Sequence, residues 1–415
     1  MRKKSGMIGA LAWLVGLALA ASAVGQTPEL SKGQSAKEIE TVLLARALES
    51  AGKYARPTLY RFAPQRRSDE RAASTVAVTA HLLLEAYRAG GGDKFLNMAR
   101  QAGDDLLVNA DLDNDGKIGW GRFWSPAAGT SRPGDGSNTT FSRNCTLPRN
   151  GPYADELYDD ARIGHFLLDL HQVTSETRFS DAVKAMLTAT WNLGAPIPGG
   201  GFYYFKTKGP CDAGFHVKNI NMMMAAVLAL ANSQEPNPRY AERLATLLRA
   251  EHDELNEAQG SANLAYYGRG DDRVTERGGY ISVAQVNGSK GWRCRVDTGS
   301  GNSCFEHLGL EARALALIGA VAPKALRRAG LGAAKIREVM AAAASREAES
   351  CQGGGRWPYS ATFCAAYHCA LRQVLPASAA LCLDRTSDPK SWTQDVTLGL
   401  FWGRPNGVLG LAEGR

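Results

Sequence analysis

Beyond its N-terminus the chain has no apolar run that approaches the roughly 20 residues a membrane-spanning helix needs. It also has no lysine-rich run and no strip that interleaves arginine with aromatic residues. Its eight cysteines show none of the paired CxxC spacing of a zinc site. These absences argue against a membrane span in the mature chain, a nucleic-acid partner and a zinc site of that kind.

The cysteines form an even set without metal-site spacing, which favours disulfide bonds. They are Cys145, Cys211, Cys294, Cys304, Cys351, Cys364, Cys369 and Cys382. Cys294 with Cys304 would close one loop and is the favoured pairing, while Cys369 with Cys382 or Cys351 with Cys364 would connect the C-terminal helices. The remaining connectivity stays open.

The first residues have the pattern of a secretory signal peptide. Three basic residues, Arg2 to Lys4, precede an apolar run from Met7 to Ala20, and small residues follow. Cleavage after Ala23 or after Gly25 would suit a signal peptidase, so residues 1–25 are predicted to be removed. The formal charge would then fall from +7 to +4, because 45 basic residues face 41 acidic ones. We expect a secreted or periplasmic protein whose weak positive field suits an acidic polymer.

One structural unit recurs along the chain. An apolar helix-length segment is followed by a tight polar turn with a basic–aromatic pair, and a second helix begins with alanines. The turns are Gly92–Phe95, Glu176–Phe179 and Pro238–Tyr240. This repetition predicts an all-α fold, an (α/α) toroid of about five to seven helical hairpins.

The expected helices, in order, cover 35–50, 72–88, 94–108, 154–173, 178–192, 216–231, 239–255, 305–321, 333–348 and 360–375. A last helix, Thr393–Trp402, is expected to close the ring against the first helix. Long joints, Asn109–Tyr153 and Asn256–Ser303, connect the units, and the second includes the strand-like Gly279–Val283. In a ring of hairpins such joints lie together at one end, where side chains can converge on a ligand. Residues 26–415 are predicted to form one domain.

These hairpins and turns resemble the secreted (α/α) toroids of polysaccharide lyases and related glycosidases, and in length and layout polysaccharide lyase family 38, the glucuronan/alginate type. The resemblance covers most of the mature chain. It implies a lyase that cleaves an acidic, uronate-containing polysaccharide by β-elimination. Terpene cyclisation is disfavoured, because Asp111–Asp115 differs from the Asp-x-Asp-Asp motif of such cyclases.

β-Elimination needs a base for the C5 proton and a cation or amide to neutralise the adjacent carboxylate. His216 is the expected base, because imidazole titrates near neutral pH and the residue stands one turn before Asn219 on one helical face. Asn219, Arg162 or an arginine of the second joint would neutralise the carboxylate. Tyr267 or Tyr158 would protonate the leaving oxygen, and the resemblance supports histidine and tyrosine for these two roles.

A second group of residues is predicted to bind the sugar. Aromatic side chains offer stacking faces, and nearby polar groups offer hydrogen bonds. The group comprises Trp120, Trp124, Tyr203, Tyr204, Asp160, Glu306 and His307. The alternative is that the tryptophans only anchor their loop. In the same way His216 or Asn219 would only cap a helix or bond between helices, and Tyr158 and Tyr267 would only pack. His81, His171 and His252 are read as core or surface residues without a site role.

Two other functions remain open. In a glycoside hydrolase, Asp159 or Asp160 would protonate the glycosidic oxygen while Asp212 or Glu306 activates water. Adjacent Asp159 and Asp160 point about 100 degrees apart on a helix, so they cannot form that pair by themselves. A noncatalytic glycan-binding envelope protein would use the same aromatic residues without proton transfer.

Asp111, Asp113 and Asp115 stand at alternating positions before Gly116, the spacing with which calcium loops collect oxygen ligands. Position twelve is Arg122 instead of a bidentate glutamate, so the loop is either a partial site completed by other residues or an Asx-rich turn without metal. Calcium would be structural here, and no cofactor is expected for the reaction. Nothing in the sequence indicates an oligomeric state.

Overall fold

The computed structural model describes residues 36–61, 73–111, 116–123, 153–155, 157–193, 218–257, 313–336 and 394–402. The predicted signal peptide, all eight cysteines, the strand-like Gly279–Val283 and the helix at 360–375 lie outside these residues. Predictions about them, and the single-domain assignment of 26–415, stay predictions.

Three predicted hairpins are confirmed. The first pairs α4 (Ala73–Ala86) with α5 (Asp93–Val108), the second α7 (Leu157–Thr174) with α8 (Thr177–Leu193), and the third α9 (Lys218–Gln234) with α10 (Pro238–Glu257). In each pair the first helix is the more buried. Every residue from Asp159 to Leu170 on α7 and from Ile220 to Ala231 on α9 is buried. Helices buried on all sides form an inner layer, and their amphipathic partners cover it.

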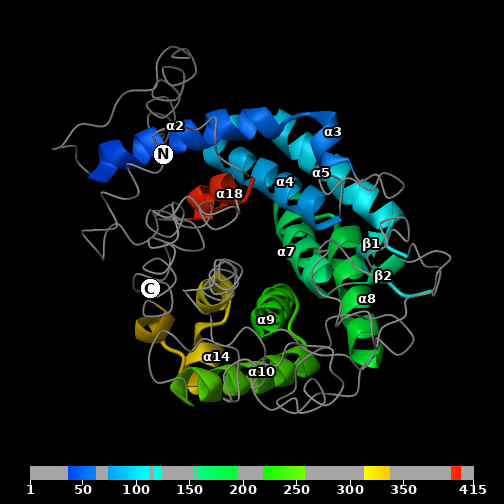
Figure 1. Ribbon diagram of the computed structural model, residues 1–415, viewed down its shortest axis with the longest axis vertical. Coiled ribbons are helices and arrows are strands. Elements are labelled where there is room, and N and C mark those ends of the chain that lie inside the picture. The colour runs from blue at the N-terminus through cyan, green and yellow to red at the C-terminus, as the bar shows by residue number, and fades with distance from the viewer. Residues whose placement is uncertain are drawn as a thin grey trace, which may run out of the picture.

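Figure 1 shows the hairpins following one another around a ring. On the inside α4 packs against α7, and α7 packs against α9. The next inner helix covers 313–321, and α14 (Pro323–Arg328) follows it and contacts α10. The described helices therefore have the predicted (α/α) toroid arrangement.

The two ends of the chain meet to close the ring. The last described helix, α18 (Gln394–Trp402), packs against both α4 and the first described helix, α2 (Ala36–Tyr54), as Figure 1 shows. The Ser50 and Thr397 hydroxyls form a buried hydrogen bond of 2.8 Å across this contact. The predicted closure by Thr393–Trp402 is confirmed.

The turns between inner and outer helices are short. After α4 the chain forms a π-helical turn, η2 (Tyr87–Gly91), and Gly90 and Gly92 adopt φ angles of 89° and 93°. L-residues with a Cβ rarely adopt such angles, which explains the glycine cluster between α4 and α5. Inner helices connected in this way run parallel, so their C-terminal ends gather at one end of the ring, the turn end.

The joint between α5 and α7 contains a two-stranded antiparallel sheet, in which β1 (Gly121–Phe123) pairs with β2 (Tyr153–Asp155). A short helix that the sequence analysis did not predict, α3 (Pro57–Tyr60), follows α2 and packs against α4. Its proline occupies the first helical position, where the missing N–H carries little cost. None of the described helices combines the length and apolar character needed to cross a membrane.

Close packing between α5 and the second hairpin gives a test of the fold. A Cβ added at Gly103 would lie 2.7 Å from Leu170 Cδ2 and 2.8 Å from Phe179 Cε1. Gly103→Ala should therefore lower stability by about 1–3 kcal/mol through overpacking. Gly52 on α2 has nothing within 4 Å of the equivalent position, so Gly52→Ala should stabilise by up to about 1 kcal/mol. Thermal denaturation of both variants compares them, and equal melting temperatures would contradict the packing described.

Candidate functional site

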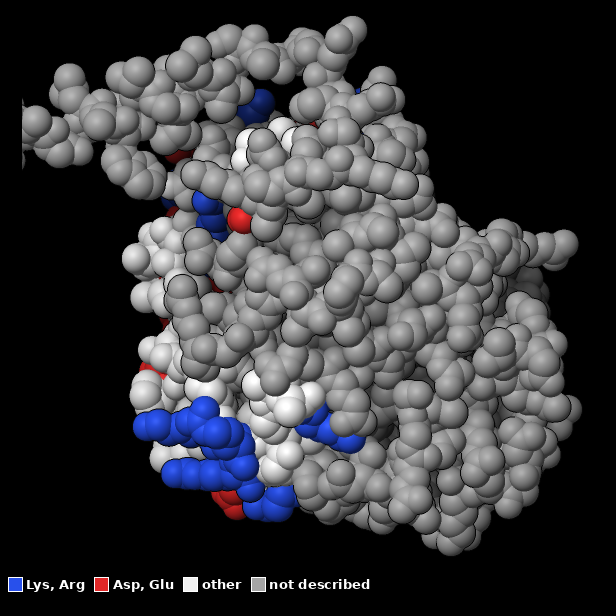
Figure 2. All heavy atoms as spheres, turned by 90° about the vertical axis from the view of Figure 1, so that its left-hand side faces the viewer, with Lys and Arg blue, Asp and Glu red and all other residues white. Residues whose placement is uncertain are grey.

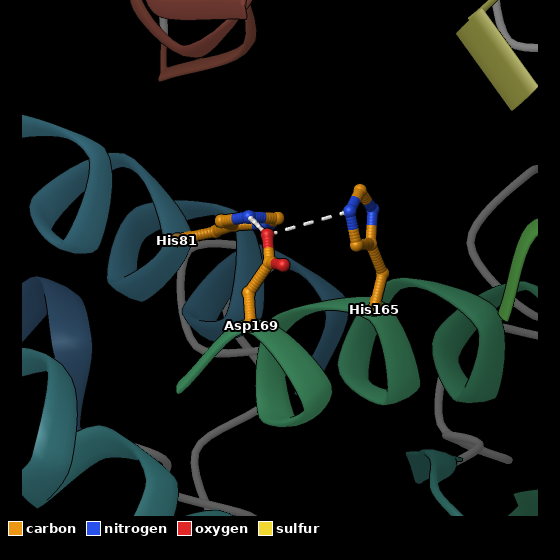
Figure 3. Close-up of side chains that lie close together, drawn as sticks. All are labelled: His81, His165 and Asp169. Carbon is orange, nitrogen blue, oxygen red and sulfur yellow. Dashed lines mark hydrogen bonds and ion pairs between the residues drawn. The ribbon is translucent and has the colours of Figure 1, made fainter. Parts of the chain in front are cut away.

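Three titratable side chains meet where α4 and α7 lie side by side: His81 on α4, and His165 and Asp169 on α7. Figure 3 shows the three pointing toward one another from the two helices. His165 and Asp169 share a helical face because they are four residues apart. His81 is 2% exposed, and His165 and Asp169 are each 5% exposed. We call His81, His165, Asp169 and the groups that contact them the central cluster.

Asp169 connects the two histidines. Its Oδ2 lies 2.7 Å from His81 Nε2, a short hydrogen bond, and 3.5 Å from His165 Nε2, a longer contact that does not meet hydrogen-bond geometry. The imidazole rings meet edge to face, with centroids 4.6 Å apart. The buried carboxylate thus faces one nitrogen of each ring.

Arg88 brings positive charge to the same carboxylate. Its Nη1 lies 3.4 Å from Asp169 Oδ2, and it also forms an ion pair with Glu85 one turn earlier. Its Nη2 donates to the Asp169 backbone carbonyl at 3.4 Å. Arg88 belongs to η2, so the π-helical turn places a partly exposed guanidinium between the turn end and the buried cluster.

Two further inner helices complete the cluster. Arg313, on the helix at 313–321, lies with Nη2 3.5 Å from His165 Nδ1. Its guanidinium carbon is 3.5 Å from the centre of the Trp402 ring, at the end of α18. The Trp402 ring is stacked with His165 at a centroid distance of 5.7 Å and meets His81 edge to face at 5.2 Å. Four helices from distant parts of the chain therefore contribute to one buried polar group.

These contacts select one tautomer of His165. A guanidinium can only donate hydrogen bonds, so His165 Nδ1 faces Arg313 with its lone pair, and the proton lies on Nε2, toward Asp169. Burial lowers the pKa of His165 well below its ordinary value, more than the charge of Asp169 raises it, and His81, Arg313 and Arg88 lower it further. His165 is therefore neutral near pH 7.

The two charged partners hold each other ionised. Burial alone would raise the pKa of Asp169, but Arg88 and the hydrogen bond from His81 outweigh burial and bring that pKa well below its usual value. Burial alone would lower the pKa of Arg88, but Asp169 and Glu85 raise it. The cluster thus contains an ionised Asp169 carboxylate on the Nε2 side of a neutral His165 imidazole.

The ligand types also invite a comparison with metal sites, because two histidines and one carboxylate hold zinc or iron in many proteins. One ligand atom from each of His81, His165 and Asp169 lies within 4.8 Å of the others. However, Arg88 Nη1 lies 3.4 Å from Asp169 Oδ2, and Arg313 Nη2 lies 3.5 Å from His165 Nδ1. Two guanidinium groups at this distance oppose a divalent cation, so we assign no resident metal to the cluster.

The arrangement has the parts needed for proton transfer. His165 offers a neutral basic nitrogen, Asp169 can stabilise the imidazolium that forms, and Arg313 supplies positive charge beside the basic nitrogen. Trp402 adds an aromatic surface against the same ring. The described residues contain no other group of three or more histidine, cysteine or acidic side chains able to hold an ion.

Two predicted catalytic residues lie on the same helical stripe as the cluster. Tyr158, Arg162, His165 and Asp169 follow one another at spacings of four, three and four residues along α7. Arg162 is buried, and its guanidinium carbon lies 4.7 Å from the centre of the Tyr158 ring. The stripe thus continues from the cluster toward the joint end of α7, which is the end at which the sequence predicted a site.

Asp160 and Trp120 form a contact that differs from their predicted role. Both are completely buried, and the Trp120 backbone N–H donates to Asp160 Oδ1 at 2.9 Å. Trp120 Nε1 donates to the Leu106 carbonyl at 2.9 Å. A ring enclosed in the core offers no face to a sugar, so the prediction of Trp120 as a stacking platform is wrong, and the loop-anchor alternative matches the structure. Asp160 holds that loop to α7 instead of facing a ligand.

Asp111 takes part in a turn. Its Oδ2 accepts a hydrogen bond from the Gly116 backbone N–H at 3.1 Å, five residues further along the chain. Asp113 and Asp115 lie outside the described residues, so calcium at this loop stays a prediction. Asn219 is the second residue of α9. The other predicted site residues lie outside the described part of the chain: His216, Tyr267, Trp124, Tyr203, Tyr204, Glu306 and His307.

The sequence analysis missed the central cluster. His81 was assigned no site role, whereas it bonds to Asp169 at the centre of the described ring. One signal was available: His165 and Asp169 stand four residues apart as the only polar residues of the buried stretch Ile163–Leu170. Buried histidine and aspartate on one stripe of an inner helix need partners, and these come from the neighbouring inner helices.

No protein-family model matches the chain, and no curated protein matches it either. Solved structures do match. One is a cellobiose 2-epimerase from Spirochaeta thermophila, with a TM-score of 0.53, 14% identity and 84% of each chain covered. Another is a D-mannose isomerase, with a TM-score of 0.55, 12% identity and coverage of 90% of this chain and 99% of that one.

At these identities the likeness concerns the fold, and it confirms the predicted (α/α) toroid. Neither of these two structures is a polysaccharide lyase, so that part of the resemblance stays a prediction.

The neutral state of His165 predicts a dependence of stability on pH. In the unfolded chain His165 would titrate near its ordinary pKa of about 6.5, whereas burial lowers that pKa in the fold. The unfolded state therefore binds more protons below about pH 6.5, and stability should fall there by up to about 1.4 kcal/mol per pH unit. The lowered pKa of Asp169 adds a further loss below about pH 4.

Melting temperatures of the native protein and of His165→Asn, measured from pH 8 to pH 5, test this dependence. Asparagine retains an acceptor for Arg313 but cannot titrate, so the variant should lose much of the decline between pH 6.5 and pH 5. An identical decline in both proteins would contradict a neutral, buried His165.

The contact between Asp160 and Trp120 predicts a structural effect. Asp160→Ala leaves a buried backbone N–H without its acceptor and should cost about 1–3 kcal/mol. Asp160→Asn keeps a carbonyl oxygen and should cost less. Urea unfolding midpoints rank the three proteins, and an Asp160→Ala variant as stable as the native protein would argue against this anchoring role.

Proposed function

We propose that the protein is a sugar-modifying enzyme that removes a proton from a sugar carbon next to a carbonyl or carboxyl group. The observation that carries the proposal is the state of His165. It is a buried, neutral imidazole whose Nε2 faces Asp169 and whose Nδ1 lies 3.5 Å from the Arg313 guanidinium.

In this reaction the bound sugar takes the place of the Arg313 N–H at His165 Nδ1, this nitrogen takes the proton, and the electron pair of the C–H bond moves toward the carbonyl or carboxyl oxygen. Arg313, beside the base, stabilises the negative charge that develops on this oxygen. Asp169 stabilises the imidazolium through Nε2, as a carboxylate does behind a catalytic histidine. Its hydrogen bond to His81 and its ion pair with Arg88 hold the carboxylate in place.

Three sugar reactions begin with this step: epimerisation, aldose–ketose isomerisation, and β-elimination from a uronate. The first two are the reaction types named for the two similar structures, a sugar epimerase and a sugar isomerase. The third is the reaction implied by the resemblance to polysaccharide lyases. We propose only the proton removal that the three reactions share. The product that forms would show which of the three reactions follows it.

The geometry of the histidines favours a single base among the described residues. His81 and His165 are in direct ring contact, so no sugar carbon can lie between them. Since His81 is also bonded to Asp169, it supports the carboxylate and is not the second base of a two-base epimerisation. One base suffices for β-elimination and for isomerisation through an enediol.

The stripe on α7 extends the proposal toward the joint end. Arg162 and Tyr158 lie one and two helical turns before His165. They would contact the part of the substrate that extends from His165 toward the joint end of α7. Arg162 would neutralise a carboxylate, and Tyr158 would protonate a leaving oxygen, the roles expected from the sequence. His216 before α9, Asn219 in the first turn of α9 and Tyr267 after α10 remain candidates for the same surface.

Proton exchange with solvent tests the shared step directly. The protein is incubated in heavy water with neutral sugars and, separately, with glucuronan, alginate and pectate, and deuterium on sugar carbons is followed by proton NMR. Unsaturated uronate is detected by ultraviolet absorbance, and new reducing ends are counted in parallel. We expect deuterium incorporation or an unsaturated product with at least one of these substrates.

His165→Asn should lower the rate by about 10²- to 10⁴-fold, which is the usual contribution of a general base. The control is His171→Asn on the same helix, because His171 Nδ1 donates to the Glu176 backbone carbonyl at 3.1 Å and the residue lies outside the cluster. It should keep nearly full activity. New reducing ends without deuterium on carbon or unsaturation would identify a hydrolase and refute the proposal, and equal activity of both variants would remove His165 from the mechanism.

A further inference from the structure

Trp402, the last residue of α18, has a single hydrogen-bond donor, the indole N–H on Nε1. The side chain is 2% exposed, and among the described residues this N–H meets no acceptor. Trp120 shows the usual arrangement, since its buried Nε1 donates to the Leu106 carbonyl at 2.9 Å. A buried donor without an acceptor is energetically costly, and few are found in folded proteins. The Trp402 N–H therefore calls for an explanation.

Donors on the surface need no such explanation, because water accepts their hydrogen bonds. Figure 2 shows Lys and Arg side chains in contact with solvent, and Lys324 and Arg327 on α14 are exposed in this way. Trp402 differs because it is buried on α18, which packs against α4 and α2. An acceptor for its N–H must therefore come from a molecule that enters the protein.

The Trp402 ring lies against the two groups that the proposed reaction uses. Its centre is 3.5 Å from the Arg313 guanidinium carbon, and it stacks with the His165 ring at a centroid distance of 5.7 Å. Because the N–H belongs to this ring, it lies near both the proposed base and the cation that would stabilise the developing charge. An oxygen on the sugar carbon next to the one that His165 deprotonates would come within reach of it.

His165 has a second donor of this kind. Its Nε2, which carries the proton, is buried and lies 3.5 Å from Asp169 Oδ2 without hydrogen-bond geometry. In unliganded enzymes, catalytic hydrogen bonds are often long and tighten only when substrate binds. Both donors belong to rings that contact Arg313, the group that the bound sugar would displace from His165 Nδ1. Substrate binding would therefore change the surroundings of both donors at once.

We infer that Trp402 is a catalytic residue, whose indole N–H donates a hydrogen bond to the sugar oxygen that gains negative charge. This inference rests on the proposed function, because that charge develops only if His165 removes the proton. Arg313 would donate to the same oxygen, and a second donor strengthens its stabilisation as the charge grows. A carbonyl and a carboxyl oxygen accept this hydrogen bond equally, so the role is the same in all three sugar reactions.

The aromatic faces of Trp402 have a separate role, since they contact Arg313 and His165 whether or not the ring carries an N–H. The two roles can be separated by a tryptophan analogue in which sulfur replaces the indole N–H. This analogue, benzothienylalanine, keeps the shape and the aromatic faces of the ring and removes only the donor. A purely structural Trp402 would tolerate the exchange.

Proton–nitrogen NMR of the full-length protein, labelled at the tryptophan indoles, observes the N–H directly. Trp402→Phe assigns the signal. Neutral sugars and short oligosaccharides of glucuronan, alginate and pectate are added in turn, and with at least one of them the Trp402 indole proton should move downfield as it gains an acceptor. The Trp120 indole proton should stay in place, because it already donates to Leu106.

Kinetics of the analogue-substituted proteins test the catalytic role. The analogue at position 402 should lower kcat by about 10²-fold, the usual loss for one donor to a developing oxyanion, and leave KM nearly unchanged. Its melting temperature should match that of the native protein, because the free protein loses no hydrogen bond. The same analogue at position 120 is the matched control: it removes the bond to Leu106, so it should lower the melting temperature and leave kcat nearly unchanged.

The inference is overturned if the Trp402 indole proton does not move with any of these sugars, as it would not if a buried water were its acceptor. A native kcat with the analogue at position 402, or a change in KM alone, would also overturn it. The two proposals fail separately. Proton exchange without a change at Trp402 would refute only this inference, whereas a change at Trp402 without proton exchange or an unsaturated product would refute the proposed function and leave the N–H as a sugar-binding donor.

Discussion

The central constraint in this structure is a carboxylate buried in the ring. Asp169 is 5% exposed and remains ionised because Arg88 and His81 contact it, and an isolated charge at that depth would be strongly unfavourable. Each contact limits a neighbouring element. Arg88 must stay at the π-helical turn after α4, α4 must present His81 toward α7, and His165 must hold its Nε2 proton on the side of the carboxylate. Removing one partner of such a group leaves the other charge buried and uncompensated, which typically costs several kcal/mol. The same contacts that place α4 against α7 therefore also prepare His165 as a neutral base.

The toroid explains how a polar cluster can form inside an apolar core. Each inner helix presents one stripe toward its neighbours in the ring, so side chains from α4, α7, the helix at 313–321 and α18 meet although they are far apart in sequence. Closure by α18 against α2 and α4 brings Trp402 to this group. The cluster lies at the middle of α7 and toward its C-terminal end, while the Tyr158 and Arg162 pair lies toward the joint end of the same stripe. A sugar bound along this stripe would meet a tyrosine, an arginine and a histidine in turn.

The fold was largely predictable because its signals are local. The apolar stripe of 154–173 and the glycine and polar turns define helices whose observed bounds, such as Leu157–Thr174 for α7, differ by a few residues at most. The closing helix was predicted at Thr393–Trp402 and is found at Gln394–Trp402. The cluster could not be predicted in the same way, because His81 and Asp169 are 88 residues apart and meet only through the packing of two helices. Trp120 illustrates the opposite error: an aromatic residue in a polar loop resembles a sugar platform, and only its contacts with Leu106 and Asp160 show that it is an anchor.

The proposed chemistry depends most directly on the protonation state of His165. Nitrogen-15 NMR of protein labelled at histidine, with His165→Asn used to assign the signal, reports both the charge of the ring and the nitrogen that carries the proton. We predict a neutral His165 at pH 7 with the proton on Nε2, a state that persists to pH values well below 6.5. A His165 ring that is charged at pH 7, or that carries its single proton on Nδ1 toward Arg313, would contradict it.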